Sequence, residues 1–186
     1  MRDLSNKKVA ILMAQGFEQS EFEKPLEALK NENADIDVIS IKSGSIKAWD
    51  QGNWGKEIEV DKTVDEVSAG DYDALVLPGG VINPDKLRVN EKATSFVRDF
   101  FEQKKPVAAI CHGPWTLINA GVVDGRKMTS YKSIRKDLEN AGANWVDEEV
   151  VVDQGLVTSR NPDDLPAFCK KMVEEIKEGK HEKQTA

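Results

Sequence analysis

The stretch of residues 106–116, PVAAICHGPWT, constrains the fold of this chain more than any other. Four apolar residues, Val107–Ile110, lead into Cys111 and His112, and a small-residue turn then opens an apolar run with helical spacing. This pattern predicts a buried strand, a sharp turn and a helix. A side chain at the apex of such a turn is lifted clear of the sheet and faces the free N–H groups that begin the helix.

Cys111 has two alternative roles at this turn. A cysteine beside a helix N-terminus can lose its proton more readily than a free thiol, whose pKa is about 8.5, and then acts as a nucleophile. The adjacent His112 and the small turn residues Gly113 and Pro114 favour this reactive role. The alternative is a cysteine that fills space in a buried strand.

The chain of 186 residues has room for one domain with a substantial core. We expect this domain to span residues 1–178 and a polar tail, residues 179–186, to be frayed. Hydrophobic residues make up 39% and charged residues 32% of the chain, as is typical of a soluble globular protein. The formal net charge of -7 argues against nucleic acid or an anionic membrane as the main partner, because both require clustered basic residues.

The cysteine and histidine content bears on the cellular compartment and on metal binding. Two cysteines, Cys111 and Cys169, make no disulfide framework, and the polar N-terminus shows no signal peptide. No apolar segment approaches the roughly 20 residues of a membrane helix. We therefore expect a cytoplasmic protein. With only two histidines, His112 and His181, and no Cys-x-x-Cys motif, we expect no metal.

Short apolar runs alternate with amphipathic segments along the chain. Ser20 and Glu23 form a capping-box pattern that predicts a helix start at Ser20. This alternation predicts an α/β fold, a doubly wound, mostly parallel, flavodoxin-like sheet between helices. The expected strands are residues 8–13, 36–41, 72–77, 107–110, 150–152 and 156–159, and the expected helices are residues 20–33, 91–103, 134–141 and 163–177.

Three other segments carry local predictions. Residues 44–56 contain Trp49 and Trp54 among turn-forming residues, which favours a hairpin or loop over a tryptophan that lines a pocket. The sequence Asn-Pro-Asp at residues 83–85 indicates a turn. Cys169 falls on the apolar face of the last helix, so we expect it in the core.

Three loops are expected to meet at one edge of this sheet. They are residues 16–20, the Gly79-Gly80 pair and the turn at Cys111, and each follows a buried strand. The carboxyl ends of the strands are where open α/β sheets bind ligands. The Gly79-Gly80 pair is equally compatible with a plain turn.

These loops and a later segment carry motifs that resemble the PfpI family of the DJ-one/PfpI superfamily, whose fold is like that of class I glutamine amidotransferase domains. The resemblance covers roughly residues 7 to 177, and several separated motifs occur in the right order. The matching motifs are Gly16-Phe17-Glu18, Leu75-Val76-Leu77-Pro78-Gly79-Gly80, Asn83-Pro84-Asp85 with Leu87-Arg88, Ala109-Ile110-Cys111-His112-Gly113-Pro114, and Ser159-Arg160-Asn161-Pro162-Asp163-Asp164-Leu165.

The resemblance implies a nucleophile, an acid and a base. Cys111 would be the nucleophile, Glu18 the acid beside its sulfur, and His112 the neighbouring base. Two acids within hydrogen-bond distance share one proton, so Cys111 would carry the charge while Glu18 keeps the proton. From the residues alone, the favoured interpretation of Glu18 is an acid that stabilises a helix start, and the alternative for His112 is a hydrogen-bonded surface or interface histidine.

The resemblance also implies groups that hold the substrate. The backbone at Gly79, Gly80 and His112 would offer N–H groups to an oxyanion, and Gly113 would permit close approach. In PfpI-type proteins an acid from a neighbouring subunit completes the triad, and the matching residue here is Asp85. That residue is an Asp where the family pattern often has the longer Glu, and its alternative role is that of a turn residue.

The implied activity is that of a cysteine hydrolase without a cofactor. We expect a glyoxalase or protein deglycase that acts on methylglyoxal and its early adducts with amines and thiols, in a homo-oligomer, either a dimer or a hexamer. The alternatives are an intracellular cysteine peptidase of the PfpI type and a non-catalytic redox-stress sensor or chaperone in which Cys111 is oxidised. A glutamine amidotransferase is disfavoured, because the only histidine downstream of His112 is His181, in the tail.

Overall fold

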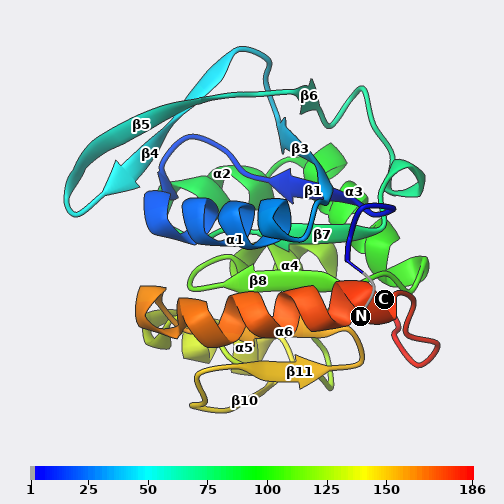
Figure 1. The fold of residues 1–186 in the computed structure, drawn as a ribbon. Coiled ribbons are helices and arrows are strands. Elements are labelled where there is room, and N and C mark those ends of the chain that lie inside the picture. Colours follow the sequence, from blue (N-terminus) through cyan, green and yellow to red (C-terminus); the bar gives the residue numbers. More distant parts are fainter. Residues whose placement is uncertain (1–2) are drawn as a thin grey trace.

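A seven-stranded sheet forms the centre of the molecule in the computed structural model, which describes residues 3–186 (Figure 1). Met1 and Arg2, part of the polar N-terminal segment, lie outside the described residues. All neighbouring strands of this sheet run parallel except the first pair. The strand order is β11 (Val151–Asp153), β12 (Leu156–Ser159), β8 (Val107–Ile110), β7 (Ala74–Leu77), β1 (Lys8–Leu12), β3 (Asp35–Ser40) and β6 (Lys62–Thr63).

Helices cover both faces of the sheet, as expected from the sequence. On one face, α1 (Gln19–Asn31) packs beside α6 (Leu165–Glu178), in front of the sheet in Figure 1. The helices behind it are α2 (Ile82–Arg88), α3 (Glu91–Glu102) and α4 (Pro114–Ala120), and α5 (Arg135–Asn140) packs against α4. The order β3, β1, β7, β8, β12 is the doubly wound flavodoxin-like order, which confirms the predicted fold class.

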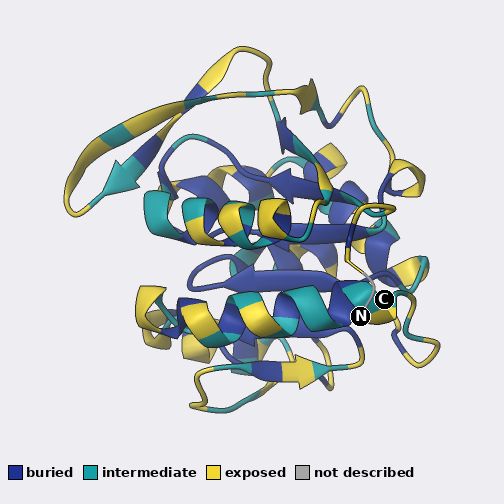
Figure 2. Cartoon of the chain, viewed as in Figure 1, coloured by how far each residue is buried: buried dark blue, intermediate teal, exposed yellow. Residues whose placement is uncertain are grey.

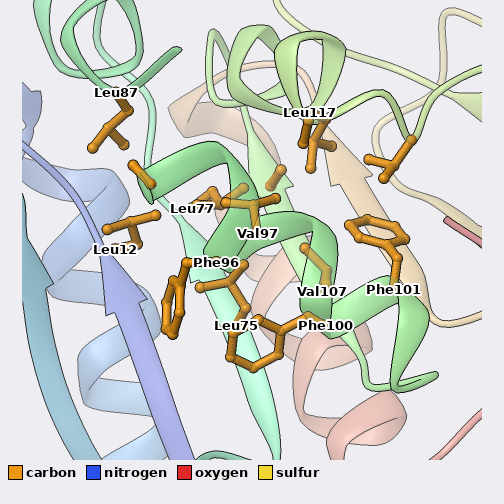
Figure 3. Packing of buried hydrophobic residues seen from close by; sticks show 14 of the residues in the cluster. Leu12, Leu75, Leu77, Leu87, Phe96, Val97, Phe100, Phe101, Val107 and Leu117 are labelled. Atoms are coloured by element: carbon orange, nitrogen blue, oxygen red, sulfur yellow. The ribbon is translucent and has the colours of Figure 1, made fainter. Parts of the chain in front are cut away.

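The central strands β1, β7, β8 and β12 are buried on both faces, which explains their continuous apolar runs (Figure 2). Alternate residues of β1, β7 and β8 point to opposite sides. Leu75, Leu77 and Val107 join a core with the phenylalanines of α3 (Figure 3). Val76 and Ile110 face the other way, into a core with α1 and α6. Among residues 3–186, no helix has the length and hydropathy needed to cross a membrane.

A hairpin of β4 (Ser45–Asp50) and β5 (Asn53–Glu59) projects from one end of the sheet, and β2 (Phe17–Glu18) pairs with it (Figure 1). The predicted hairpin at residues 44–56 is thus present. Trp49 and Trp54 face each other across its two strands, with ring centroids 5.3 Å apart. Two further short strands, β9 (Lys127–Met128) and β10 (Asn144–Trp145), pair with each other.

Two local predictions near the helix starts are wrong. Residues 83–85 lie inside α2 rather than in a turn, because Pro84 falls in the first helical turn, where its missing N–H breaks no hydrogen bond. Helix α1 begins at Gln19 with Glu18 as its N-cap, so the capping box of Ser20 and Glu23 does not form.

The C-terminal tail is docked on the body, contrary to the expected fraying. The backbone N–H of His181 donates to the carbonyl oxygen of Lys104 at 2.9 Å. The guanidinium of Arg126 donates to the Thr185 carbonyl, and Gln184 is buried. These are contacts with segments distant in sequence, so the polar composition of the tail could not show them.

The buried side chain of Asn83 connects the carboxyl ends of two central strands. Its Oδ1 accepts a hydrogen bond from the Ala14 N–H at 2.7 Å, just beyond β1. Its Nδ2 donates to the carbonyl oxygens of Pro78 and Gly79, each at 3.0 Å, just beyond β7. One amide therefore holds together the two loops between which the strand order reverses.

Replacing Asn83 with alanine should destabilise the fold by about 2–4 kcal/mol, because it leaves the buried Ala14 N–H and the Pro78 carbonyl without partners and removes one of the two hydrogen bonds to the Gly79 carbonyl. Urea unfolding would measure this change. The exposed Asn31→Ala variant is the matched control and should change the free energy of unfolding by less than about 1 kcal/mol. Equal effects of the two variants would contradict the bridging role of Asn83.

Candidate active site

A pocket of about 590 Å³ opens at the carboxyl ends of β1, β7 and β8. It lies where the strand order reverses, the usual ligand site of a doubly wound sheet. The structure brings the three predicted loops together here and adds Trp49 of the hairpin, so this tryptophan lines a pocket as well as pairing across strands. The lining residues are Gly16, Glu18, Glu21, Trp49, Gly80, Val81, Ile82, Cys111, His112, Tyr131, Ser133 and Pro162.

Cys111 lies at the apex of the turn between β8 and α4 in a left-handed backbone conformation, with φ of 63°. This conformation costs a residue other than glycine roughly 1–2 kcal/mol. Two hydrogen bonds hold it: the Cys111 N–H donates to Ser159 at 3.1 Å, and the Cys111 carbonyl accepts from Tyr131 at 2.9 Å. The turn therefore presents the sulfur at the pocket floor, as the strand-turn-helix pattern predicts.

Two glycines allow the chain to close tightly around this turn. A Cβ on Gly113 would lie 2.7 Å from the Leu77 carbonyl oxygen, and its N–H already donates to Ile110 at 2.9 Å. Gly113 therefore joins the strands β7 and β8 closely and offers the substrate no N–H group, contrary to its expected binding role. A Cβ on Gly79 would lie 2.7 Å from the Cβ of Cys111.

The acid beside the sulfur is Glu21, and the assignment of Glu18 to this place is wrong. Glu21 is fully buried, and its Oε1 accepts the N–H of Gly79 at 3.0 Å. Its carboxyl group interacts with the Cys111 thiol, and both side chains lie against the position that a Cβ on Gly79 would occupy. The N–H of Gly79 is thus occupied, while the N–H groups of Gly80 and His112 face the sulfur. Of the expected oxyanion donors, these last two remain.

Burial sets the protonation of this pair. It raises the pKa of Glu21 to about 8, and the charge of Glu18 adds to the rise, against the opposing N–H of Gly79. Burial also raises the pKa of the Cys111 thiol, as does an ionised Glu21, while the N–H groups of Gly80 and His112 lower it. The expected low thiol pKa is therefore not found. At neutral pH Glu21 is protonated and uncharged, so it does not repel a negative charge on the sulfur.

His112 is placed to take the thiol proton. Its Nδ1 lies 3.2 Å from the Cys111 sulfur, and its Nε2 lies 3.2 Å from Ser133 Oγ. The ring stacks on Tyr131, with centroids 4.8 Å apart. Burial lowers the pKa of His112, although the charge of Asp137 raises it, so the imidazole is neutral at pH 7. With Nδ1 free to accept, Nε2–H donates to Ser133.

Glu18 lies in the same pocket but in another environment. It is half-buried at the N-cap of α1, and burial, followed by the charge of Asp50, raises its pKa. Glu18 lines the pocket, and the acid that interacts with the sulfur is Glu21.

Asp85 does not contact His112 of its own chain. Its exposed carboxylate accepts hydrogen bonds from Arg88 Nε at 3.0 Å and Nη2 at 2.7 Å. The Arg88 guanidinium lies 4.2 Å from the centre of the Trp115 ring, and Trp115 meets the His112 ring edge-on at 5.1 Å. Within one chain, Asp85 is thus connected to the imidazole only through two intervening side chains.

A sequence pattern could have identified Glu21. Residues 21, 25 and 29 form one i, i+4, i+8 row on α1, and Pro25 and Leu29 of this row are buried. A carboxyl group in an otherwise apolar row requires a buried partner. The family motif, which ends at Glu18, drew attention to the wrong acid.

Cys169 lies at the margin of the core expected for it. From its position on α6, Cys169 packs partly buried against the core. It also lines a separate groove between α1 and α6.

Known proteins resemble this chain over most of its length. The model of the DJ-1/PfpI family matches residues 7–175. General stress protein 18 of Bacillus subtilis is 49% identical over 87% of this chain and 93% of its own length. A deglycase of Thermococcus kodakarensis is 49% identical over 89% of this chain and 97% of its own. A putative cysteine protease of Bacillus subtilis, YraA, is 42% identical over 92% and 99%, respectively.

A solved structure shows the same fold. It is a two-domain protein from Anabaena variabilis with DJ-1/ThiJ/PfpI-like and ferritin-like domains. The match has a TM-score of 0.87 and 38% identity and covers 92% of this chain and 48% of that protein, so this chain spans about half its length.

The raised pKa of Glu21 predicts a pH-dependent stability. Between the ordinary pKa of 4.5 and about 8, the folded state keeps a proton that the unfolded state releases, so stability should fall as the pH rises through this window. Relative to Glu21→Gln, which cannot titrate, the parent should lose up to about 1.4 kcal/mol per pH unit there. Urea unfolding from pH 5 to 9 would measure the difference, with exposed Glu59→Gln as control. Parallel profiles of the parent and Glu21→Gln would contradict the assignment.

Proposed function

Because the chain belongs to the DJ-1/PfpI family, we propose that it is a cofactor-independent deglycase and glyoxalase that acts on methylglyoxal and on its early adducts with amines and thiols. The observation that carries the proposal is the pair of Cys111 and His112, whose sulfur and Nδ1 lie 3.2 Å apart at the floor of a small pocket. A relative named as a deglycase, 49% identical to this chain, supports the same reaction class.

The first step forms a carbon–sulfur bond. The Cys111 sulfur adds to the aldehyde carbon of methylglyoxal, and its proton passes through His112 Nδ1 to the carbonyl oxygen, which gives a hemithioacetal. In an early amine adduct the sulfur displaces the amine from the same carbon, and the amine leaves with a proton. The N–H groups of Gly80 and His112, which face the sulfur, stabilise negative charge there.

The second step moves hydrogen between neighbouring carbons. His112 removes the proton from the carbon bonded to sulfur, and a proton is added to the next carbon. The aldehyde carbon is thereby oxidised while its neighbour is reduced, so the step needs no external redox cofactor. Water then cleaves the resulting lactoyl thioester, which releases lactate and restores the thiol.

The pocket is large enough for methylglyoxal bound to an amine side chain. The volume of about 590 Å³ exceeds that of a three-carbon aldehyde, which leaves space for the amine side chain of an adduct. Glu18 lines this space and, when ionised, would attract a cationic amine or guanidinium. This proposal places the enzyme in the cytoplasm, where methylglyoxal modifies protein amines and thiols.

Cys111→Ser should reduce lactate release from methylglyoxal, and from methylglyoxal-treated N-acetylarginine, by roughly a hundredfold or more, because a hydroxyl is a far weaker nucleophile at this site. An enzymatic lactate assay would measure the rate. Cys169→Ser, at the margin of the core, is the matched control and should keep the parent rate.

The same preparations separate the alternatives. Cleavage of a peptide substrate that depends on Cys111, without lactate release, would replace the proposal with the protease activity for which one relative is named. If neither reaction occurs, and mass spectrometry finds two oxygens on Cys111 after peroxide treatment, the redox-sensor alternative would hold instead.

We further propose that Asp85 acts across the interface of a homo-oligomer. Its carboxylate is exposed and hydrogen-bonds the neighbouring Arg88, so it is accessible to a second copy. There it would accept the Nε2–H of His112 in the second copy, in place of Ser133, and hold the imidazole in position, as the family motif implies.

Mixing Cys111→Ala with Asp85→Asn, after dissociation and reassembly, should restore activity. For random closed dimers about a quarter of the sites would combine an intact Cys111 with an intact Asp85. The lactate assay measures this recovery, and native mass spectrometry of the mixture confirms that mixed oligomers form. Full activity of Asp85→Asn alone would show that the carboxylate is dispensable. An inactive Asp85→Asn that mixing does not rescue would place its role within its own chain, through Arg88 and Trp115.

A further inference from the structure

Three side chains with metal-binding atoms meet where the C-terminal tail leaves α6. Glu175 and Glu178 occupy the last turn of the helix, and His181 follows on the tail. His181 Nε2 lies 3.0 Å from Glu175 Oε2 and 4.0 Å from Glu178 Oε2. All three ligand atoms lie within 4.8 Å of one another.

Two of these atoms are buried without a hydrogen-bond partner in the described part of the chain. They are Glu175 Oε2 and His181 Nε2, which approach each other without the alignment of a hydrogen bond. The Glu175 side chain is only 10% exposed and is aimed at the imidazole. A buried carboxylate oxygen and a buried ring nitrogen are costly when they make no hydrogen bond, so a cation bound to both atoms would stabilise this geometry.

A neighbouring side chain has the same deficit. Gln184 is buried, and neither its Oε1 nor its Nε2 has a partner among residues 3–186. Its Oε1 and the His181 ring lie against the same residue, Gly155. Polar atoms without hydrogen-bond partners, from Glu175 and from Gln184, therefore lie near the imidazole.

We propose that Glu175, Glu178 and His181 bind a divalent transition metal ion of the zinc class. A neutral imidazole nitrogen and two carboxylate oxygens form a donor set that zinc accepts, with water in the fourth position. Two ligands of a tetrahedral zinc ion are about 3.3 Å apart, and the observed separations of 3.0 and 4.0 Å lie on either side of this value. The prediction of no metal was based on the number of histidines and cysteines and did not consider carboxylate ligands.

This site is separate from the pocket of Cys111. Gly155, beside His181, bonds to Val107 at the start of β8, whereas Cys111 follows the end of that strand. The two sites thus lie at opposite ends of strand β8. Figure 1 shows the C-terminus beside the end of α6. A metal ion here would fix the tail to α6 and leave the reaction unchanged.

Zinc titration of the full chain tests the proposal. The Cys111→Ser background removes the thiol of the other pocket as a ligand, and the protein is first treated with a chelator. Competition with a chromophoric zinc chelator should find one equivalent per chain. Glu178→Gln, which changes an exposed side chain and therefore spares the fold, should weaken zinc binding at least tenfold, and His181→Gln should do the same.

Two further measurements make the result specific. Glu174→Gln, which changes an exposed acid paired with Lys171 on the same helix, is the matched control and should bind zinc as the parent does. Zinc should also slow proteolysis of the tail in the parent and in Glu174→Gln but not in Glu178→Gln. Absence of saturable binding, or equal affinities of Glu178→Gln, His181→Gln and the parent, would overturn the proposal.

Discussion

The burial of one carboxyl group, that of Glu21, determines the chemistry of the site. No cation lies beside it among the groups that set its pKa, so burial keeps it protonated at neutral pH. Its position depends on Gly79, whose N–H it accepts and whose missing side chain lets it approach Cys111. The loops after β1 and β7 must therefore stay in register with the turn after β8, and the amide of Asn83 joins the first two.

A protonated acid next to a buried thiol changes how the nucleophile can form. The helix start and the N–H groups of Gly80 and His112 favour a charged sulfur, but burial outweighs them in the resting site. The proton can leave only to a neutral base within reach, and His112 is that base. In the proposed reaction, activation of Cys111 would thus be a proton transfer between two neighbouring side chains, and its rate would depend on the orientation of the imidazole between Tyr131 and Ser133.

The sequence was sufficient for features that depend on local pattern. The two-sided burial of β1, β7 and β8 produces uniform apolar runs, and the strand-turn-helix pattern at Cys111 places the sulfur in the pocket. It was insufficient where distant segments decide. Residues 83–85 were predicted to form a turn but lie in a helix, from which the side chain of Asn83 hydrogen-bonds two loops. The tail was predicted to be frayed but packs against the body, with Gln184 buried. Glu21, by contrast, could have been chosen over Glu18 from the sequence, because it shares a buried row of α1 with Pro25 and Leu29.

The hairpin of β4 and β5 separates recognition from catalysis. It contributes Trp49 to the pocket wall, yet its strands pair only with each other and with β2, outside the seven-stranded sheet that holds Cys111. Changes in hairpin length or in the residue at position 49 therefore reshape one wall of the pocket without moving the nucleophile. A family built on this plan can diversify the molecules it accepts by altering a peripheral ribbon while the reacting groups stay the same.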